Sequence, residues 1–272
     1  MAARMTARLM GIVRNIPKRS QDTMATGTPR PITFQPDIYD KVLSLLPKDK
    51  QCRILDVGAG EGYLSRKLRD LAYEVGACDF LAEEFRCSDV PFKKANLNEG
   101  LPYADNTFDC TVSIEVIEHI ENHFTFVAEM VRVTKPGGML IIATPNVLSL
   151  PSRWHFFLYG YTDCAPVPLN PDCRDYFMQH INPISLPELL FHLERFGADL
   201  VTLTTNRLRR SSFVPMLLLY PLLAISLRLK LLRKKYKDVS VLHRRHIRWG
   251  LSRANLMGRI TIAVARKRTA MQ

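Results

Sequence analysis

Residues 53–62 read Arg-Ile-Leu-Asp-Val-Gly-Ala-Gly-Glu-Gly, a short apolar run that leads into a glycine-rich turn. The apolar run is typical of a buried parallel strand, which carries hydrophobic side chains on both faces. The glycines at 58, 60 and 62 permit positive φ angles and let a ligand approach the backbone closely. Leucines at 64, 68 and 71 follow at helical spacing. The segment therefore predicts a strand, a turn and a helix whose N-terminus faces the turn.

An acidic residue ends the next predicted strand. The apolar stretch 73–78 leads into Asp79, about twenty residues after Gly60. Rossmann-type folds hold the hydroxyls of a ribose with an acidic residue at this spacing. We therefore expect a cofactor that contains a nucleoside, with Asp79 and the neighbouring Phe80 in its site.

The spacing and charge of the turn indicate which cofactor. Dinucleotide sites read G-x-G-x-x-G, whereas this turn reads G-x-G-x-G, with Asp56 before it and Glu61 within it. Two carboxylates would repel a phosphate at a range of a few ångströms, where Coulomb energies are large. They suit a cationic ligand that carries an α-amino group and a sulfonium. The segment resembles motif I of the class I S-adenosylmethionine (SAM) methyltransferases, although nucleotide-binding α/β domains of other kinds also contain glycine turns.

Later segments continue the resemblance in order. Residues 92–97 and 110–114 predict a third and a fourth strand, and a helix is expected to end at Val133. Lys-Pro-Gly-Gly at 135–138 breaks that helix before a fifth strand at 139–143. Over about residues 50–206 the chain is similar to the branch that contains the ubiquinone-biosynthesis O-methyltransferases and many enzymes of bacterial glycan clusters.

The resemblance implies an α/β, Rossmann-like fold with a seven-stranded sheet. Its strands are mostly parallel, the last strand is antiparallel, and helices cover both faces. We expect the sixth strand at 199–206 and the seventh at 259–265, which leaves a long insertion between them. The domain organisation is then a basic tail (1–30), a methyltransferase core (31–206), an insertion (207–258) and a final strand with a basic tail (259–272).

The resemblance also implies the residues that bind SAM, which lie at the ends of the first four strands. An acidic residue in the family commonly meets the adenine amino group at the position of Asn96, whose amide oxygen can accept the same hydrogen bond. Glu115 is expected at the methionine end of the donor. The full expected set is Asp56, Gly58, Ala59, Gly60, Glu61, Gly62, Asp79, Phe80, Asn96, Leu97, Ser113 and Glu115.

The donor chemistry indicates the catalytic residues. A sulfonium methyl is already activated, so the protein mainly aligns the acceptor in line with the S–CH₃ bond and excludes water. A hydroxyl acceptor also needs a base, for which His119 is the first candidate and His180 or His155 the second. Alternatively, Glu115, Glu118 and His119 resemble the Glu-x-x-Glu-His of small-RNA 3′-terminal methyltransferases, where a distal histidine completes a Mg²⁺ site. His180 is the candidate for that histidine, and a metal would lower the pKa of the acceptor hydroxyl. In the simplest alternative, Glu118 and His119 only orient their loop.

The net charge of +12 is concentrated at the two ends. Residues 1–30 carry six Arg/Lys and one Asp, and residues 228–272 carry fourteen and one, which leaves 31–227 with a net charge of −6. This distribution argues against nucleic acid as a partner and for an anionic surface near the C-terminus. The tail 1–30 is expected to be disordered, although its composition is also that of a mitochondrial transit peptide, or sequence upstream of a start at Met24. Six cysteines without metal spacing indicate reduced thiols in a cytoplasmic compartment.

Two segments outside the core predict contacts with substrate and membrane. Residues 147–185 form a long aromatic-rich connection, which we expect to cover the substrate, and Ser185 with Glu188 predicts a capping box that starts a helix. Residues 211–227 carry no charge but contain Pro215 and Pro221, and no second apolar span follows. This 17-residue run is at the lower limit for crossing a bilayer, so we expect an interfacial element.

Basic residues follow this apolar run directly, and they would suit anionic headgroups. They are Arg228, Lys230, Arg233, Lys234, Lys235 and Lys237, and a second basic cluster at 243–248 is a candidate for phosphate contacts. Alternatively, the insertion is a buried helical hairpin over the substrate site with a solvated basic face.

The leading function hypothesis is O-methylation of a hydroxyl on a membrane-associated, lipid-linked glycan by a peripheral membrane enzyme. The alternatives are O- or C-methylation of a polyprenyl phenol or quinone, and SAM binding at a membrane without turnover.

Overall fold

The computed structural model describes residues 35–164, 169, 179–232 and 241–269. Within these residues the strands form one seven-stranded sheet in the order β3-β2-β1-β4-β5-β7-β6, in which only β7 is antiparallel. This arrangement confirms the predicted Rossmann-like fold. The strands are β1 (Arg53–Val57), β2 (Glu74–Asp79), β3 (Phe92–Lys94), β4 (Phe108–Ile114), β5 (Thr134–Pro145), β6 (Ala198–Thr204) and β7 (Ile260–Lys267).

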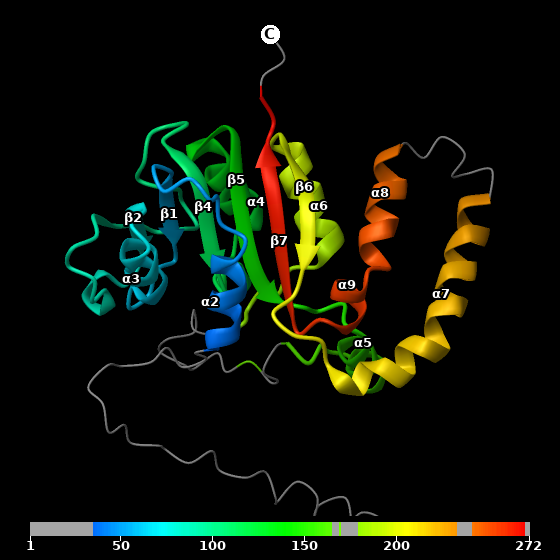
Figure 1. Ribbon diagram of the computed structural model, residues 1–272. Helices are drawn as coiled ribbons and strands as arrows, with labels where there is room; N and C mark the ends of the chain where they lie inside the picture. Colours follow the sequence, from blue (N-terminus) through cyan, green and yellow to red (C-terminus); the bar gives the residue numbers. More distant parts are fainter. Residues whose placement is uncertain (1–34, 165–168, 170–178, 233–240, 270–272) are drawn as a thin grey trace, which may run out of the picture. The chain divides into compact units, whose positions relative to one another are not determined.

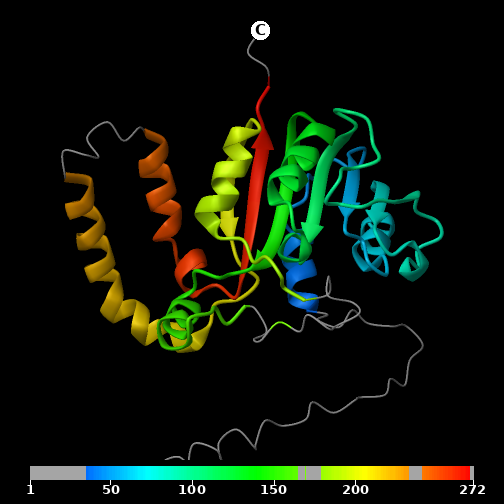
Figure 2. The same ribbon diagram turned by 180° about the vertical axis from the view of Figure 1, so that it is seen from behind.

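Helices cover both faces of the sheet (Figure 2). One face packs against α2 and α3, whose apolar residues share a core with β1, β2 and β4. The other face packs against α4 and α6. The helices are α2 (Pro36–Leu43), α3 (Tyr63–Asp70), α4 (His123–Val133), α5 (Leu150–Tyr159), α6 (Leu186–Arg195), α7 (Phe213–Leu232), α8 (Val241–Gly250) and α9 (Arg253–Met257), with short 3-10 turns η1 (Ala82–Glu84), η2 (Ile117–His119) and η4 (Arg210–Ser212).

The strand order places the ligand-binding edge. Strand β1 pairs with β2 on one side and with β4 on the other. Strands β2 and β3 therefore extend the sheet in one direction and β4–β7 in the other, so the strand order reverses beside β1. Open α/β sheets bind ligands at this switch point, outside the carboxyl ends of the strands. Figure 1 shows α2, α5, α9 and the first turns of α7 along this edge. We call it the donor edge.

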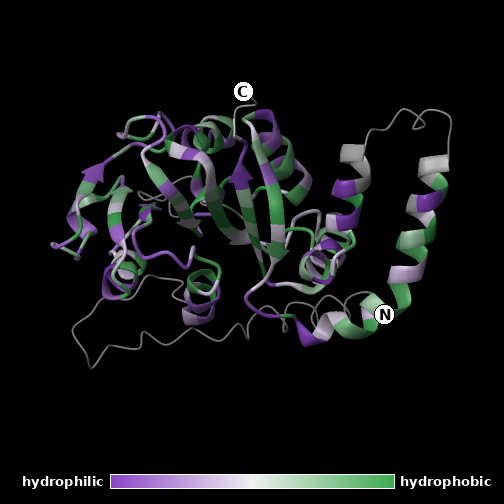
Figure 3. Cartoon of the chain, turned by 45° about the horizontal axis from the view of Figure 1, so that its top comes forward, coloured by the Kyte–Doolittle hydropathy of each residue, from purple (hydrophilic) through white to green (hydrophobic). Residues whose placement is uncertain are grey.

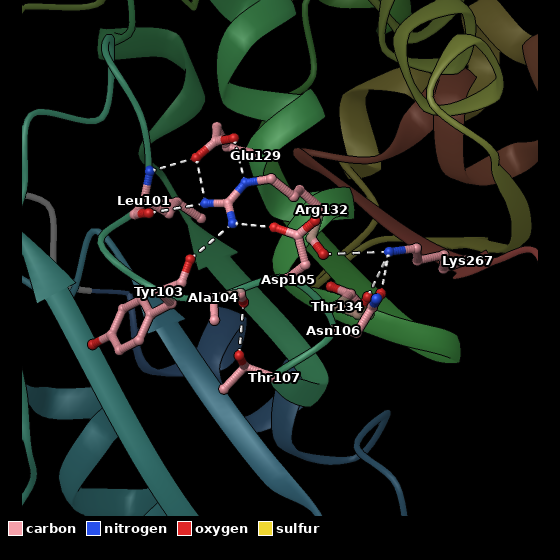
Figure 4. Close-up of polar contacts among 10 residues, drawn as sticks. All are labelled: Leu101, Tyr103, Ala104, Asp105, Asn106, Thr107, Glu129, Arg132, Thr134 and Lys267. Atoms are coloured by element: carbon pink, nitrogen blue, oxygen red, sulfur yellow. Dashed lines mark hydrogen bonds and ion pairs between the residues drawn. The ribbon is translucent and has the colours of Figure 1, made fainter.

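A polar network closes the opposite edge of the sheet around Arg132, at the end of α4 (Figure 4). Its guanidinium donates to both carboxylate oxygens of Glu129 (2.6 and 2.7 Å), to Asp105 (2.7 Å) and to the Leu101 carbonyl. Lys267 of β7 donates to Asn106 and to the Thr134 carbonyl. These bonds fix the loop that enters β4, which positions the other end of β4 at the donor edge.

Some predicted element limits were wrong. Strand β3 ends at Lys94 because Asn96 starts a turn, with its Oδ1 accepting from the Asn98 amide. Strand β5 begins at Thr134, so Gly137 and Gly138 lie within a strand and not in a break between elements. The predicted capping contact is confirmed, since the Ser185 hydroxyl accepts from the Glu188 amide at the start of α6.

The aromatic connection and the insertion contain helices. Helix α5 starts five residues after β5 ends, so the predicted long loop is helical over its first part. The insertion holds α7, α8 and α9. Helix α7 is bent (Figure 1), and it contains Pro221, a residue type that kinks helices. Within the described residues no helix has the length and apolarity to span a bilayer. The tail 1–30 and most of the first basic cluster (233–237) lie outside the described residues.

Candidate functional site

The turn after β1 contains three glycines with positive φ: Gly58 (+76°), Gly60 (+50°) and Gly62 (+83°). A Cβ atom at Gly58 would lie 2.3 Å from a methyl carbon of Val116. A Cβ atom at Gly60 would meet no heavy atom within 4 Å. Gly58 is therefore required for packing, whereas Gly60 keeps the backbone accessible on the side where a ligand would bind.

These two glycines make a matched pair of variants. Gly58→Ala is expected to lower the free energy of unfolding by about 2–4 kcal/mol, because it adds a clash with Val116 to the backbone strain. Gly60→Ala is expected to cost only about 1 kcal/mol of stability but to weaken donor binding. Urea unfolding and titration with SAM measure the two effects. Equal losses of stability would contradict the packing role of Gly58.

Asp79 lies at the end of β2 beside the turn. Its Oδ2 accepts from the Gly60 amide (2.8 Å) and its Oδ1 accepts from the Leu81 amide (3.0 Å). The carboxylate is partly exposed, so it has lone pairs available for further hydrogen bonds. This geometry fits the predicted ribose contact, which stays a prediction.

Asp56 is a buried charge behind the turn. It is 3% exposed, and the hydroxyl of Ser65 in α3 donates to it (2.6 Å). Burial raises its pKa to about 7, although the hydrogen bond from Ser65 opposes that shift. Asp56 therefore joins β1 to α3, and its effect on a cationic donor would come from its charge.

Glu115 lies where the chain leaves β4, with a positive φ of 54° that is unusual for a residue with a side chain. Burial, followed by the nearby charge of Asp37, raises its pKa to about 7. The side-chain amide of Gln35 lies 3.4 Å from its Oε1. Backbone strain of this kind clusters at functional sites.

Helix α2 adds residues that the sequence analysis did not include in the site. Burial raises the pKa of Tyr39, and the carboxylates of Asp56 and Glu115 raise it further, so all three groups lie in one region. The Tyr39 ring packs edge-to-face on Tyr63, at 4.7 Å between centroids. The sequence contains two signals for this helix, a proline at its start and apolar residues at helical spacing. No motif links this helix to the donor.

The remaining predicted donor residues have different surroundings. The amide nitrogen of Asn96 donates to Glu99 (2.7 Å), so this side chain already stabilises the turn after β3. Leu97 is buried in the core, and Phe80 is 47% exposed with the Lys94 ammonium near its ring. The Ser113 hydroxyl is buried, without a hydrogen-bond partner among the described residues.

The two other residues of the turn, Ala59 and Glu61, have different surroundings. Ala59 is partly buried against the core on the side of α3, and its amide donates to the Cys78 carbonyl. Burial raises the pKa of Glu61, and the nearby Glu84 adds to that shift. The contacts expected between these residues and the donor stay predictions.

Glu118, His119 and His180 form a cluster beyond the end of β4. One ligand-capable atom from each lies within 4.8 Å of the others, and the two imidazole rings pack edge-to-face at 4.9 Å. The His180 Nε2 lies 4.0 Å from the Glu118 Oε1. All three residues are candidate site residues by sequence, and the structure brings them together.

Hydrogen bonds orient both imidazoles. The Nδ1 of His119 lies 2.9 Å from the Gln179 carbonyl oxygen, and the Nδ1 of His180 lies against the Cys164 carbonyl oxygen. A carbonyl accepts only, so each Nδ1 carries the proton and each Nε2 carries the lone pair when the ring is neutral. This tautomer suits both a base and a metal ligand.

Glu118 is fully buried in this cluster. Thr144 donates to its Oε2 (2.9 Å), whereas its Oε1 has no hydrogen-bond partner among the described residues. Burial, followed by the charge of Glu115, raises the pKa of Glu118 to about 8. Burial of an ionised carboxylate costs free energy, and a cation or a proton donor beside Oε1 would reduce that cost.

One expected metal ligand and one candidate base lie outside this cluster. Glu115, the fourth expected metal ligand, does not belong to the group that the described residues form. His155, the other candidate base, lies in α5 with its Nδ1 3.1 Å from the Tyr161 carbonyl. Its ring packs against Tyr159 and Tyr161.

Known proteins match the chain over the core. Residues 55–142 match the family model described as a methyltransferase domain. A probable S-adenosylmethionine-dependent methyltransferase of Mycolicibacterium smegmatis is 32% identical over 142 residues, which cover 50% of this chain and 49% of the relative. A demethylmenaquinone methyltransferase of Beutenbergia cavernae is 32% identical over 139 residues, which cover 47% of this chain and 58% of the relative. The chain thus spans about half the length of these curated relatives.

A solved structure matches over a longer region. The crystal structure of a SAM-dependent methyltransferase from Archaeoglobus fulgidus covers 85% of this chain and 93% of its own, with a TM-score of 0.54 and 18% identity. At this identity the likeness shows the fold alone. The family model and the sequence matches support a class I S-adenosylmethionine-dependent methyltransferase domain in the core of the chain.

Proposed function

We propose that the chain transfers the methyl group of SAM to a hydroxyl on a membrane-associated, lipid-linked glycan. The observation that carries this proposal is the position of the Glu118–His119–His180 cluster, which lies at the donor edge just after β4. The glycine turn and Asp79 lie at the same edge. A donor bound at the turn and a proton-accepting group would then share this edge, as O-methylation needs.

The acidic groups at the donor edge supply the electrostatics for SAM. Asp56, Asp79 and Glu115 surround the turn, and a sulfonium with an α-ammonium favours their ionised forms. The donor's ribose hydroxyls would bind Asp79. A bound cation would therefore lower the raised pKa values of Asp56 and Glu115.

A neutral His119 or His180 can accept the proton of the acceptor hydroxyl at Nε2. The backbone carbonyl at each Nδ1 holds the ring in the correct tautomer and stabilises the imidazolium that forms. Removal of the proton as the methyl moves increases the nucleophilicity of the oxygen. We assign His119 as the base, with His180 as its alternative.

Alternatively, we propose that the cluster holds a divalent cation, in which case both Nε2 atoms would be ligands and neither imidazole would act as the base. The unpartnered Oε1 of Glu118 and two oriented imidazoles fit such an ion, and a bound cation would lower the pKa of an acceptor hydroxyl. Mg²⁺, our expectation from the sequence, prefers oxygen ligands throughout. One carboxylate and two imidazoles fit an ion such as Zn²⁺ or Fe²⁺ better.

The glycan acceptor is supported by polar groups at the donor edge beside α2. Asn206 donates to Asp37 (2.8 Å), and the Arg207 guanidinium lies 3.8 Å from the same carboxylate. Arg209 pairs with Asp163, which follows α5 within the aromatic connection. Such groups suit sugar hydroxyls. The alternative, a polyprenyl phenol or quinone, is supported by the demethylmenaquinone methyltransferase relative and by the apolar α7.

One labelling experiment distinguishes these acceptors. The protein is incubated with methyl-labelled SAM and membrane lipids of its source, and the lipid extract is then treated with mild acid, which cleaves a sugar from a lipid diphosphate. The proposal predicts label that enters the organic phase and moves to the aqueous phase after acid. Label that stays in the organic phase would indicate the quinone. An absence of transferred label in a protein that binds SAM would support a binding protein without turnover.

A further inference from the structure

Helix α7 exposes apolar side chains all around its axis. An apolar residue is usually exposed singly, and a contiguous exposed group indicates a surface that something covers. An amphipathic helix would have turned these side chains to the protein and presented a polar face to water. The exposed residues are Phe213, Val214, Leu217, Leu218, Leu219, Tyr220, Leu222, Ile225 and Leu229, each 40–69% exposed.

Helix α5 continues this surface. Five of its residues are also 51–77% exposed: Trp154, Phe156, Phe157, Leu158 and Tyr159. Both helices are anchored on α9, because Leu150 of α5 and Met216 of α7 belong to one small core with Leu256 and Met257. We call the exposed side chains of α5 and α7 the α5–α7 face. Figure 3 shows hydrophobic colour along most of α7, whereas α8 carries hydrophilic bands.

A groove with a volume of about 370 Å³ lies beside this face, between α7 and α9. Its walls are apolar residues of α7 (Phe213, Met216, Leu217, Tyr220, Pro221) and Met257 of α9, and Arg253 is the charged residue among them. An apolar groove with one cation beside it has the shape and charge to hold a hydrocarbon chain below an anionic headgroup.

The charges on the insertion beside the face are nearly all positive, and the exposed Asp163, just after α5, pairs with Arg209. After Asp199 the sequence contains a single acidic residue, Asp238, which lies outside the described residues. Arg210, Arg228, Arg248 and Arg253 are all exposed. Such a surface attracts an anionic bilayer, whereas two copies of it would repel each other. The charge therefore favours a membrane over a second copy of the chain.

We propose that the α5–α7 face docks the protein on the surface of an anionic phospholipid bilayer. Helix α5 follows β5, η4 and α7 follow β6, and α9 precedes β7, so all of them lie at the donor edge. Docking would bring this edge to the headgroup layer, where a lipid-borne hydroxyl is located. The methyl donor could then enter from water. The proposal goes beyond the methyl-transfer reaction and does not depend on the identity of the acceptor.

The test measures binding of the full chain to vesicles without donor or acceptor, so that it is independent of methyl transfer. We expect the protein to co-sediment with vesicles that contain about one-third phosphatidylglycerol, and to bind pure phosphatidylcholine vesicles at least about tenfold more weakly. The triple variant Leu217→Glu, Leu218→Glu, Leu222→Glu should lose at least about tenfold in binding. These side chains are 63–69% exposed, so the fold should be retained. Phe191→Glu, at an exposed residue of α6, is the matched control and should bind normally.

Fluorescence locates the contact. The chain contains two tryptophans, and Trp249→Phe leaves Trp154 of α5 as the only one. We expect Trp154 emission to shift to the blue on anionic vesicles and to be quenched by brominated acyl chains. Vesicle binding that persists in the triple variant, or Trp154 emission that does not change, would overturn the proposal. Dimers in sedimentation analysis without vesicle binding would overturn it in favour of a second copy.

Discussion

Glu118→Gln is expected to make the metal-free protein more stable and to reduce methyl transfer by about 100-fold or more. The folded-state pKa of Glu118 is raised to about 8 from 4.5, so the folded protein holds a proton that the unfolded chain releases between these values. The stability of the wild-type protein therefore falls as pH rises from about 4.5 to about 8. Glutamine mimics the protonated acid and removes this cost, which gives a gain of about 4 kcal/mol at pH 8 and about 1 kcal/mol at pH 5.

Urea unfolding of both proteins at the two pH values, with a chelator present, measures this gain. Glu83→Gln, at an exposed carboxylate, is the control and should leave the pH dependence unchanged. A divalent ion should then stabilise the wild-type protein but not Glu118→Gln, because binding to the folded state adds to stability. If the free energy of unfolding depends on pH equally in Glu118→Gln and in the wild-type protein, ionisation of the buried Glu118 carboxyl does not destabilise the fold, which would contradict the prediction.

Replacement of His119 by alanine is expected to lower kcat by about 10²–10⁴-fold, because a general base contributes that much. The affinity for SAM should change little, since the donor contacts lie in the glycine turn and at Asp79. His180→Ala should lower kcat by a similar factor. If the two rings act as one unit, the kcat of the double variant should be scarcely lower than that of either single variant.

His155→Ala provides the matched control, because this histidine packs against Tyr159 and Tyr161 outside the cluster. Single-turnover methyl transfer and calorimetry with SAM separate the chemical step from binding. A loss of SAM affinity that accounts for the whole loss of rate in His119→Ala would show that the residue supports the donor site instead.

The core fold was predictable because its signals are local. The strand–turn–helix of 53–71 and the acid at the end of β2 each depend on a few neighbouring residues. Glu118, His119 and His180 were named from their residue types. Their convergence depends on how the segment before α6 folds back over η2, where the Asn182 amide donates to the Glu118 carbonyl.

Other features depend on long-range packing. The position of α2 beside Glu115 results from contacts across the sheet, including the bond between Asp37 and Asn206, 169 residues apart. The exposure of α7 was also not readable from composition, because an apolar run predicts a buried hairpin as readily as an exposed helix. Part of the second basic cluster is used internally, since His246 pairs with Glu194 (2.9 Å) and Arg245 lies 3.8 Å from Asp199.

Carboxyl groups around the glycine turn are expected to bind a cationic methyl donor, and calorimetric titration with SAM tests this most directly. At pH about 6.5 the donor's α-amino group is already charged, whereas the raised pKa values of Asp56 and Glu115 leave both groups partly protonated in the unliganded protein. Titrations in two buffers with different ionisation enthalpies should show one site per chain and a net release of protons. An absence of binding to SAM, with NADH or ATP bound in its place, would contradict the account.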